Sequence, residues 1–172
     1  MAFLDDDDFW NDKKLEKQVA IFEKDSQIGL VYCGYERITN NKIVTRIMPD
    51  PKFKGKIGIE VFTKIFSITS CLVVKKNLLE EIGGFDEKLG HWQEYDLSIR
   101  ISKISNIDFV DECLVTIIST TKDPSRLSNQ VAVSYTHLDV YKRQQQHLST
   151  LIDKKKLFLH KKMLLQLTSR CV

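Results

Sequence analysis

Two clusters of carboxylates are the residues whose types and spacing could do chemistry in this chain. Four consecutive aspartates, Asp5 to Asp8, follow the apolar residues 2–4, and a second cluster places Glu94 and Asp96 in the string HWQEYD. Clustered carboxylates are hard oxygen ligands that suit Mg²⁺ or Mn²⁺, which is often shared with the phosphates of a substrate. A carboxylate beside an apolar side chain can have a raised pKa and accept a proton. The clusters therefore indicate metal-assisted chemistry on a phosphorylated substrate.

A purely structural interpretation of the same residues stays open. Asp5 to Asp8 could favour the N-terminus of a following helix through its dipole and cap it. Asp96 could equally be a first-turn carboxylate that interacts with a helix dipole. Trp92, next to the second cluster, could stack on a sugar ring or only pack the loop.

The elements that must position these clusters alternate between strands and helices. Residues 2–4 read as the end of a buried strand that delivers the aspartates to its carboxyl edge, where ligands bind in open α/β sheets. The helix at 11–24 has Leu15, Val19 and Phe22 at helical spacing and Asn11 or Asp12 as its cap. Further strands are predicted at 28–35, 43–47, 68–74 and 107–118. Further helices are predicted at 57–66 and at 77–82, which ends before Gly83-Gly84. A last helix begins at the second cluster and has Leu97, Ile101 and Ile104 on its apolar face. This alternation predicts the α/β class.

Composition excludes several classes of protein. The chain has 172 residues, 42% of them hydrophobic, and a net charge of +3 without a basic stripe among aromatics, which argues against nucleic acid as a partner. Its four cysteines form no Cys-x-x-Cys pair, so neither a zinc site nor a disulfide framework is expected. No apolar run approaches the roughly 20 residues of a membrane span, and no signal peptide opens the chain. A reducing, cytoplasmic location follows.

One stretch resembles translated adapter sequence rather than natural protein. Residues 133–144 read VSYTHLDVYKRQ, which matches a transposase end sequence used in DNA sequencing, joined to its own reverse complement and translated in one frame. Residues 170–172, Arg-Cys-Val, match the same element again. We therefore interpret 131–144 as an adapter-derived insert and exclude it from the fold. Residues 145–172 form a Lys- and Leu-rich helical tail that either continues the same gene or comes from elsewhere.

The remaining motifs resemble the family 2 glycosyltransferases of the GT-A fold. In order, they are LDDDDFW, KLEKQ, GLVYCGY, LVVKK, EEIGGFDEKL and WQEYDLSIRI, all within residues 1–130. The resemblance implies an inverting transferase that moves a sugar from a nucleotide-diphosphate sugar to the hydroxyl of a glycan or lipid-linked acceptor, in cell-surface polysaccharide synthesis. It also implies an incomplete GT-A mixed sheet with flanking helices, followed by the C-terminal helical segment.

The same resemblance assigns roles to residues. The Asp-x-Asp metal motif falls on Asp5 and Asp7, with Asp6 and Asp8 as neighbours in the donor-diphosphate region. The family's Glu-Asp pair aligns with Gln93-Glu94, so Glu94 is the candidate base, a departure from the commoner aspartate, and Asp96 is the alternative. The acceptor side is assigned to Trp92, Gly84 and Phe85, with Phe85 buried. Arg126 could meet the diphosphate or form an exposed salt bridge.

The family's strand and turn that bind the donor base have no counterpart ahead of Met1, so the resemblance implies an N-terminally truncated and inactive fragment. Two other functions stay open: a metal-dependent nucleotidyltransferase, and a non-catalytic module that binds a glycan or a protein. The Lys-rich tail could associate peripherally with the inner face of a membrane, or be a solvated amphipathic helix.

Overall fold

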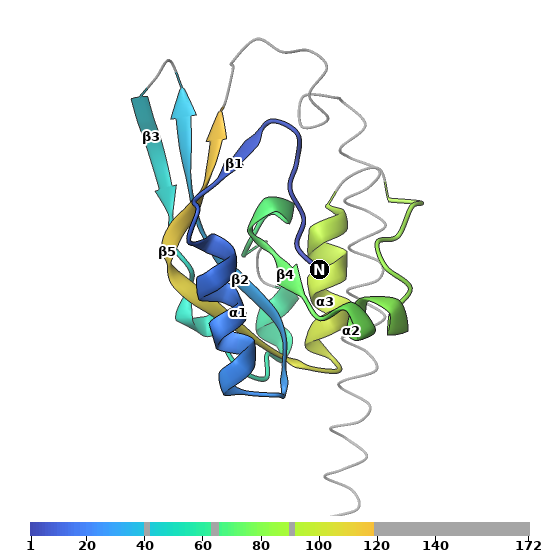
Figure 1. Cartoon of the computed structure of the whole chain (residues 1–172). Coiled ribbons are helices and arrows are strands. Elements are labelled where there is room, and N and C mark those ends of the chain that lie inside the picture. Colours follow the sequence, from blue (N-terminus) through green and yellow to red (C-terminus); the bar gives the residue numbers. More distant parts are fainter. Residues whose placement is uncertain (40–41, 63–65, 90–91, 119–172) are drawn as a thin grey trace, which may run out of the picture. The chain divides into compact units, whose positions relative to one another are not determined.

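The computed structural model describes residues 1–39, 42–62, 66–89 and 92–118 (Figure 1). These residues belong to one compact unit, Met1–Val131. Its strands and α-helices are β1 (Asp8–Trp10), α1 (Lys14–Lys24), β2 (Ile28–Thr39), β3 (Lys42–Ile47), β4 (Val73–Val74), α2 (Lys76–Glu81), α3 (Gln93–Ser102) and β5 (Asn106–Ile118). The predictions for Arg126, for the 131–144 insert and for the 145–172 tail lie outside the described residues.

A five-stranded mixed sheet organises the described part of the chain, which confirms the predicted α/β class. Its order is β1-β5-β2-β3, and β4 pairs with the first half of β2. The β2 and β5 strands run parallel, with Tyr32 opposite Phe109, whereas the other pairs are antiparallel. The β2 strand is therefore central, with β5 along one edge and β4 and then β3 along the other.

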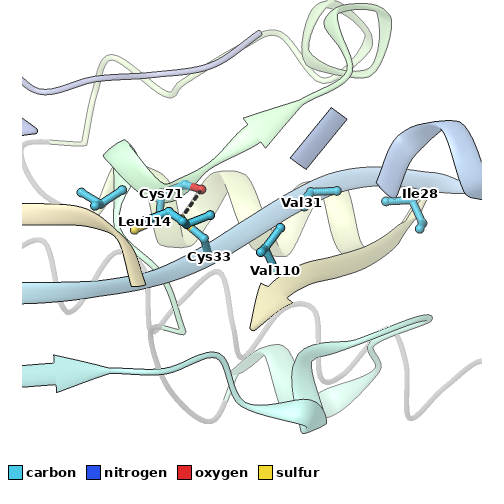
Figure 2. Packing of buried hydrophobic residues seen from close by; sticks show 7 residues of the cluster. Ile28, Val31, Cys33, Cys71, Val110 and Leu114 are labelled. Atoms are coloured by element: carbon cyan, nitrogen blue, oxygen red, sulfur yellow. Dashed lines mark hydrogen bonds between the residues drawn. The ribbon is translucent and has the colours of Figure 1, made fainter. Parts of the chain in front are cut away.

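Both faces of β2 are covered, which explains why its sequence is almost continuously apolar. On one face, Val31 and Cys33 join a core cluster (Figure 2). Ile21 and Phe22 of α1 pack against this cluster. On the other face, the Tyr32 ring lies 5.0 Å from the ring of Phe66. Alternate residues of one strand thus support two cores.

The helix α1 packs against the sheet through a face that matches the predicted one only at Phe22. Leu15 and Val19 are 43% and 45% exposed, whereas Lys14 and Gln18 are fully buried. The Lys14 ammonium lies 4.1 Å above the Trp10 ring, and burial lowers the pKa of that ammonium. The Gln18 amide donates to the carbonyls of Val31 and Cys71, at 3.0 and 2.9 Å. Polar groups with buried partners therefore outweigh the apolar periodicity here.

Three other predicted elements are shorter than expected. Residues 2–4 contribute an isolated bridge between Ala2 and Val73 instead of a strand. The described residues of the region 57–66 form a 3₁₀ turn at Ile59–Phe62 instead of an α-helix, in keeping with a glycine and β-branched residues of low helix propensity. The predicted strand at 68–74 begins with a 3₁₀ turn, Thr69–Cys71, before β4.

Candidate active site

The aspartates form a turn, which we call the acidic turn (Asp5–Asp8), between the Ala2 bridge and β1. The Asp8 amide donates to the Asp5 carbonyl at 3.2 Å and closes the turn. Asp5, Asp6 and Asp7 are exposed, while Asp8 is only 9% exposed and pairs with Ile117 of β5. Three carboxylates therefore reach solvent together, and the fourth begins a strand.

The helix-capping interpretation of the aspartates is wrong. The strand β1 separates the acidic turn from α1, and Lys13 occupies the N-cap position without a side-chain cap. The predicted cap at Asn11 or Asp12 is also displaced, because the Asn11 side chain accepts from the Lys13 amide, at 2.9 Å, in the turn before the helix. The acidic turn thus does not serve the helix that follows it.

The acidic turn carries concentrated negative charge. Burial raises the pKa of the Asp5 carboxyl, and the charges of Asp7 and Asp6 raise it further, while a hydrogen bond from Ser70 lowers it. Each charge makes the ionised state of its neighbour more costly, so a bound cation would relieve the repulsion.

The second cluster opens α3 from a strained residue. Trp92 precedes the helix with φ +63° and ψ +30°, a left-handed conformation that costs a non-glycine residue about 1–3 kcal/mol. Its carbonyl accepts from the amides of Tyr95 and Asp96, each at 3.1 Å, and its ring meets the Tyr95 ring edge-on at 6.2 Å. This geometry starts the helix abruptly and places Glu94 in its first turn.

Glu94 lies near the acidic turn although the two are far apart in sequence. Burial raises the pKa of the Glu94 carboxyl, its own backbone amide lowers it, and the negative charge of Asp5 raises it. The Ser98 hydroxyl donates to the Glu94 carbonyl at 2.7 Å and stabilises that turn of α3. The fold thus places Glu94 within range of the negative charge of Asp5.

Asp96 is engaged differently from Glu94. It is 5% exposed, and its Oδ2 accepts from Arg100 Nε at 2.8 Å. Arg100 Nη1 also donates to the Ile82 carbonyl, at the end of α2, at 3.0 Å. The Asp96 carboxylate therefore takes part in an ion pair that ties α3 to the turn after α2.

The turn assigned to the acceptor side lies beside the acidic turn. Gly83 and Gly84 have φ of +80° and +71°, and the Gly84 amide donates to the Leu79 carbonyl at 2.8 Å, which ends α2. Phe85 is half-buried, less than predicted, and its ring meets the Phe3 ring edge-on at 5.0 Å. Because Phe3 precedes Asp5 by two positions, this contact joins the two turns.

The residues present fit a divalent cation that is shared with a substrate. In the part of the chain that the structure describes, no three histidine, cysteine or carboxylate side chains are grouped to hold a metal ion. Mg²⁺, however, commonly takes one or two carboxylates from a protein and completes its shell with water and substrate phosphates. The exposed carboxylates of Asp5 and Asp7 can supply that number.

Sequence reasoning missed two residues that hold the site together. Ser70 accepts from the Asp5 amide, and Arg100 binds Asp96. The spacing of Asp96 and Arg100, four residues apart on a helix, was a usable signal. Nothing local to Ser70 indicates its partner, because the contact joins residues 65 positions apart.

Comparisons with known proteins identify the family of this chain. The model of a family described as "Glycosyltransferase like family 2" matches residues 1–160. An uncharacterized glycosyltransferase of Rickettsia prowazekii is 34% identical over 66% of this chain and 37% of its own length. The Escherichia coli UDP-Glc:alpha-D-GlcNAc-diphosphoundecaprenol beta-1,3-glucosyltransferase WfgD is 32% identical over 64% of this chain and 41% of its own. The chain thus spans less than half the length of these two relatives.

A solved structure shares the fold. The crystal structure of Staphylococcus aureus TarS in complex with UDP-GlcNAc matches 75% of this chain and 36% of that one, with a TM-score of 0.55 and 14% identity. The family match covers most of the residues, and the fold agrees with it. This chain belongs to the glycosyltransferase-like family 2.

Proposed function

We propose that this chain supplies the acceptor-side part of an inverting glycosyltransferase that uses a nucleotide-diphosphate sugar and acts in cell-surface polysaccharide synthesis. The acceptor is the hydroxyl of a glycan or of a lipid-linked sugar. The name of the E. coli relative, which includes a UDP-sugar donor and a lipid-linked acceptor, supports this choice. The UDP-GlcNAc bound to TarS supports a nucleotide-sugar donor.

The observation that carries the proposal is that Glu94 is largely buried and feels the charge of Asp5. Burial raises the pKa of Glu94, and the negative charge of Asp5 raises it as well, which supports a site that both carboxylates share. One belongs to a turn suited to a cation and a diphosphate, and the other has the raised pKa expected of a general base. A site for glycosyl transfer needs both functions side by side.

In this mechanism Glu94 accepts the proton of the acceptor hydroxyl. The acceptor oxygen bonds to the anomeric carbon as the bond from that carbon to the diphosphate breaks, which inverts the configuration. A divalent cation held by Asp5 and Asp7, with Asp6 adjacent, would neutralise the charge of the leaving diphosphate. Asp96 is the weaker candidate base, because its carboxylate already binds Arg100.

The product of the reaction tests the proposal. The protein expressed from the locus sequenced in unfragmented source DNA is incubated with Mn²⁺, UDP-glucose or UDP-GlcNAc, and a diphospholipid-linked GlcNAc acceptor, and the products are separated. The proposal expects UDP and an extended acceptor, both abolished by Asp7→Ala or Glu94→Ala. Release of sugar 1-phosphate, which leaves when UMP is transferred from the UDP-sugar, would instead indicate a nucleotidyltransferase. Acceptor binding that survives both substitutions, without turnover, would indicate a binding module.

We also propose that the protein works in the cytoplasm, with its tail at the inner face of the membrane. Cys33, Cys71 and Cys113 carry free thiols, as a reducing compartment favours. Among the described helices, none has the length and apolar character needed to cross a bilayer. Sedimentation with anionic and with neutral vesicles tests the membrane contact, which should require the anionic lipid.

A further inference from the structure

We propose that Ser70 is a positioning residue that holds the acidic turn in place, and that through this hold it sets where Asp5 and Asp7 meet the donor diphosphate. The effect on the donor diphosphate rests on the proposed function. The contacts between Ser70 and the acidic turn do not depend on it. Ser70 is completely buried, so its hydroxyl cannot reach either substrate. Its role is therefore to position other residues.

Ser70 binds both ends of the chain segment that contains the acidic turn. Its Oγ accepts from the Asp5 amide at 3.0 Å, where the turn begins. Its backbone carbonyl accepts from the indole Nε1 of Trp10 at 2.9 Å, just after the turn ends. The Ser70 hydroxyl also hydrogen bonds to the Asp5 carboxylate. One small residue therefore restrains the three exposed carboxylates between these two points.

The segment that carries Ser70, Thr69–Val74, is itself firmly attached and can serve as a platform. Val73 and Val74 pair with Val31 and Leu30 of the central strand. The Cys71 carbonyl accepts from the buried amide of Gln18 at 2.9 Å. The Met1 carbonyl accepts from the Val74 amide at 2.8 Å, so the residues ahead of the acidic turn run along the same platform.

Trp10 extends the hold to α1. Its ring lies under the buried Lys14 ammonium at 4.1 Å, while its indole N–H is bound to Ser70. The cation–π contact and the hydrogen bond restrict the ring in two directions. The end of the acidic turn is thereby held between α1 and the platform, and Ser70 supplies the polar contacts at both ends.

The chain offers a matched control for this role in Ser67. It is also buried, at 6% exposed, and lies three positions earlier, but among the described residues the hydrogen bond of its Oγ goes to the neighbouring Ile68 carbonyl, at 3.5 Å, and not to the acidic turn. Ser70→Ala and Ser67→Ala remove the same atom from similar surroundings. If Ser70 has only a structural role, the two substitutions should have similar effects. If Ser70 positions the acidic turn, only Ser70→Ala should affect that turn.

The test measures water exchange of the Asp5 amide by NMR and the affinity for Mn²⁺ by electron paramagnetic resonance, on the full chain. Ser70→Ala should speed Asp5 exchange about fivefold to tenfold, as loss of one hydrogen bond implies, and weaken Mn²⁺ binding by a similar factor. Ser70→Thr, which restores the hydroxyl, should return both values toward wild type, and Ser67→Ala should change neither. Trp10→Phe, which removes the indole donor, should weaken Mn²⁺ binding even if Ser70→Ala does not fold.

The proposal is overturned if the Asp5 amide stays protected in Ser70→Ala, or if Ser67→Ala has the same effects. It is also overturned if the wild-type protein binds Mn²⁺ and Trp10→Phe binds it with the same affinity. If wild type binds no Mn²⁺ while Ser70→Ala alone exposes the Asp5 amide, the proposed cation site is wrong and the hold of Ser70 on the turn stands.

Discussion

At the scale of residues, the site depends on two carboxylates that burial and mutual repulsion make less acidic. Burial and the Asp5 charge raise the pKa of Glu94, and burial with the Asp7 and Asp6 charges raises that of Asp5. A base is most effective when its pKa approaches the working pH. The neighbouring charge therefore prepares Glu94 to accept a proton, and any cation at Asp5 would oppose that effect.

Replacing Asp5 should change the titration of Glu94. Asp5→Asn removes a negative neighbour, so the ionised form of Glu94 becomes less costly and its pKa should fall. In the metal-free protein, NMR of the Glu94 side-chain carboxyl carbon should show a lower midpoint than in wild type. Asp12→Asn, at another exposed aspartate close in sequence, is the control and should leave the midpoint in place. An unchanged midpoint in Asp5→Asn would mean that the two carboxylates do not interact.

The candidate residues could be found from sequence only where their order and type formed a motif. The acidic turn and Glu94 belong to such an order, and the structure brings Asp5 and Glu94 together. Ser70 could not be found, because its role comes from backbone groups of a distant segment. The burial of Lys14 and Gln18 could not be predicted from their types, because an aromatic ring and two carbonyls that accept from Gln18 account for it.

At the scale of elements, α3 is fixed by a buried ion pair rather than by apolar packing alone. Arg100 joins Asp96 on α3 to the Ile82 carbonyl at the end of α2. The first turn of α3 carries Glu94, and the turn after α2 carries Phe85, so this arginine links the candidate base to the acceptor side. Leu97 and Ile101 of α3 are buried as the sequence predicted, but Ile104 is 45% exposed, because the helix ends at Ser102.

Breaking this ion pair should cost far more than breaking an exposed one. Arg100→Ala would leave Asp96 buried without its partner, and we expect about 3 kcal/mol of lost unfolding free energy. The matched control is Lys76→Ala, which removes an exposed pair with Glu80 at the same four-residue spacing and should cost about 0.5 kcal/mol or less. Urea denaturation followed by circular dichroism measures both. Equal losses would show that Arg100 has no special structural role.

The turn after α2 requires glycine for its backbone conformation. A Cβ at Gly84 would meet no atom within 4 Å, but φ is +71°, which disfavours any L side chain. Gly84→Ala should therefore destabilise the protein by about 1 kcal/mol without a steric clash. Gly58→Ala, where φ is not positive, is the comparison and should cost less in a thermal unfolding experiment. A neutral Gly84→Ala would mean that the turn relaxes freely.

The elements were predictable to the extent that they were long and periodic. The strands β2 and β5 and the helix α3 begin near their predicted positions. The apolar pattern of the region 68–74 predicted a strand. The pattern does not reveal the hydrogen bonds that Ser70 and Cys71 make to other segments. Those tertiary contacts accompany a 3₁₀ turn where local propensity favoured a strand.

At the scale of the whole molecule, we propose that the described fold is the part of a glycosyltransferase that holds the acidic turn and Glu94. The central strand β2 pairs in parallel with β5 and carries the platform through β4. The two relatives named above extend over more than twice the length that this chain matches. We therefore expect donor binding to need residues beyond those aligned here.

Sequencing the locus tests the interpretation of residues 131–144 and of the chain's beginning. Amplification from unfragmented source DNA should yield codons that lack the VSYTHLDVYKRQ string and an upstream segment that encodes the donor-base half. The protein from that locus should transfer sugar, whereas the 172-residue chain should not. A locus identical to the present sequence would contradict the adapter interpretation.

The most direct test of the central claim compares Glu94→Gln with wild type in sugar transfer by the protein from the verified locus. Transfer is followed as UDP release that depends on acceptor, with Glu23→Gln, an exposed glutamate on α1, as the control. The account predicts at least a ~100-fold fall in kcat with little change in the KM for donor, because only proton transfer is lost. A Glu94→Gln enzyme that keeps wild-type kcat would show that the base lies elsewhere.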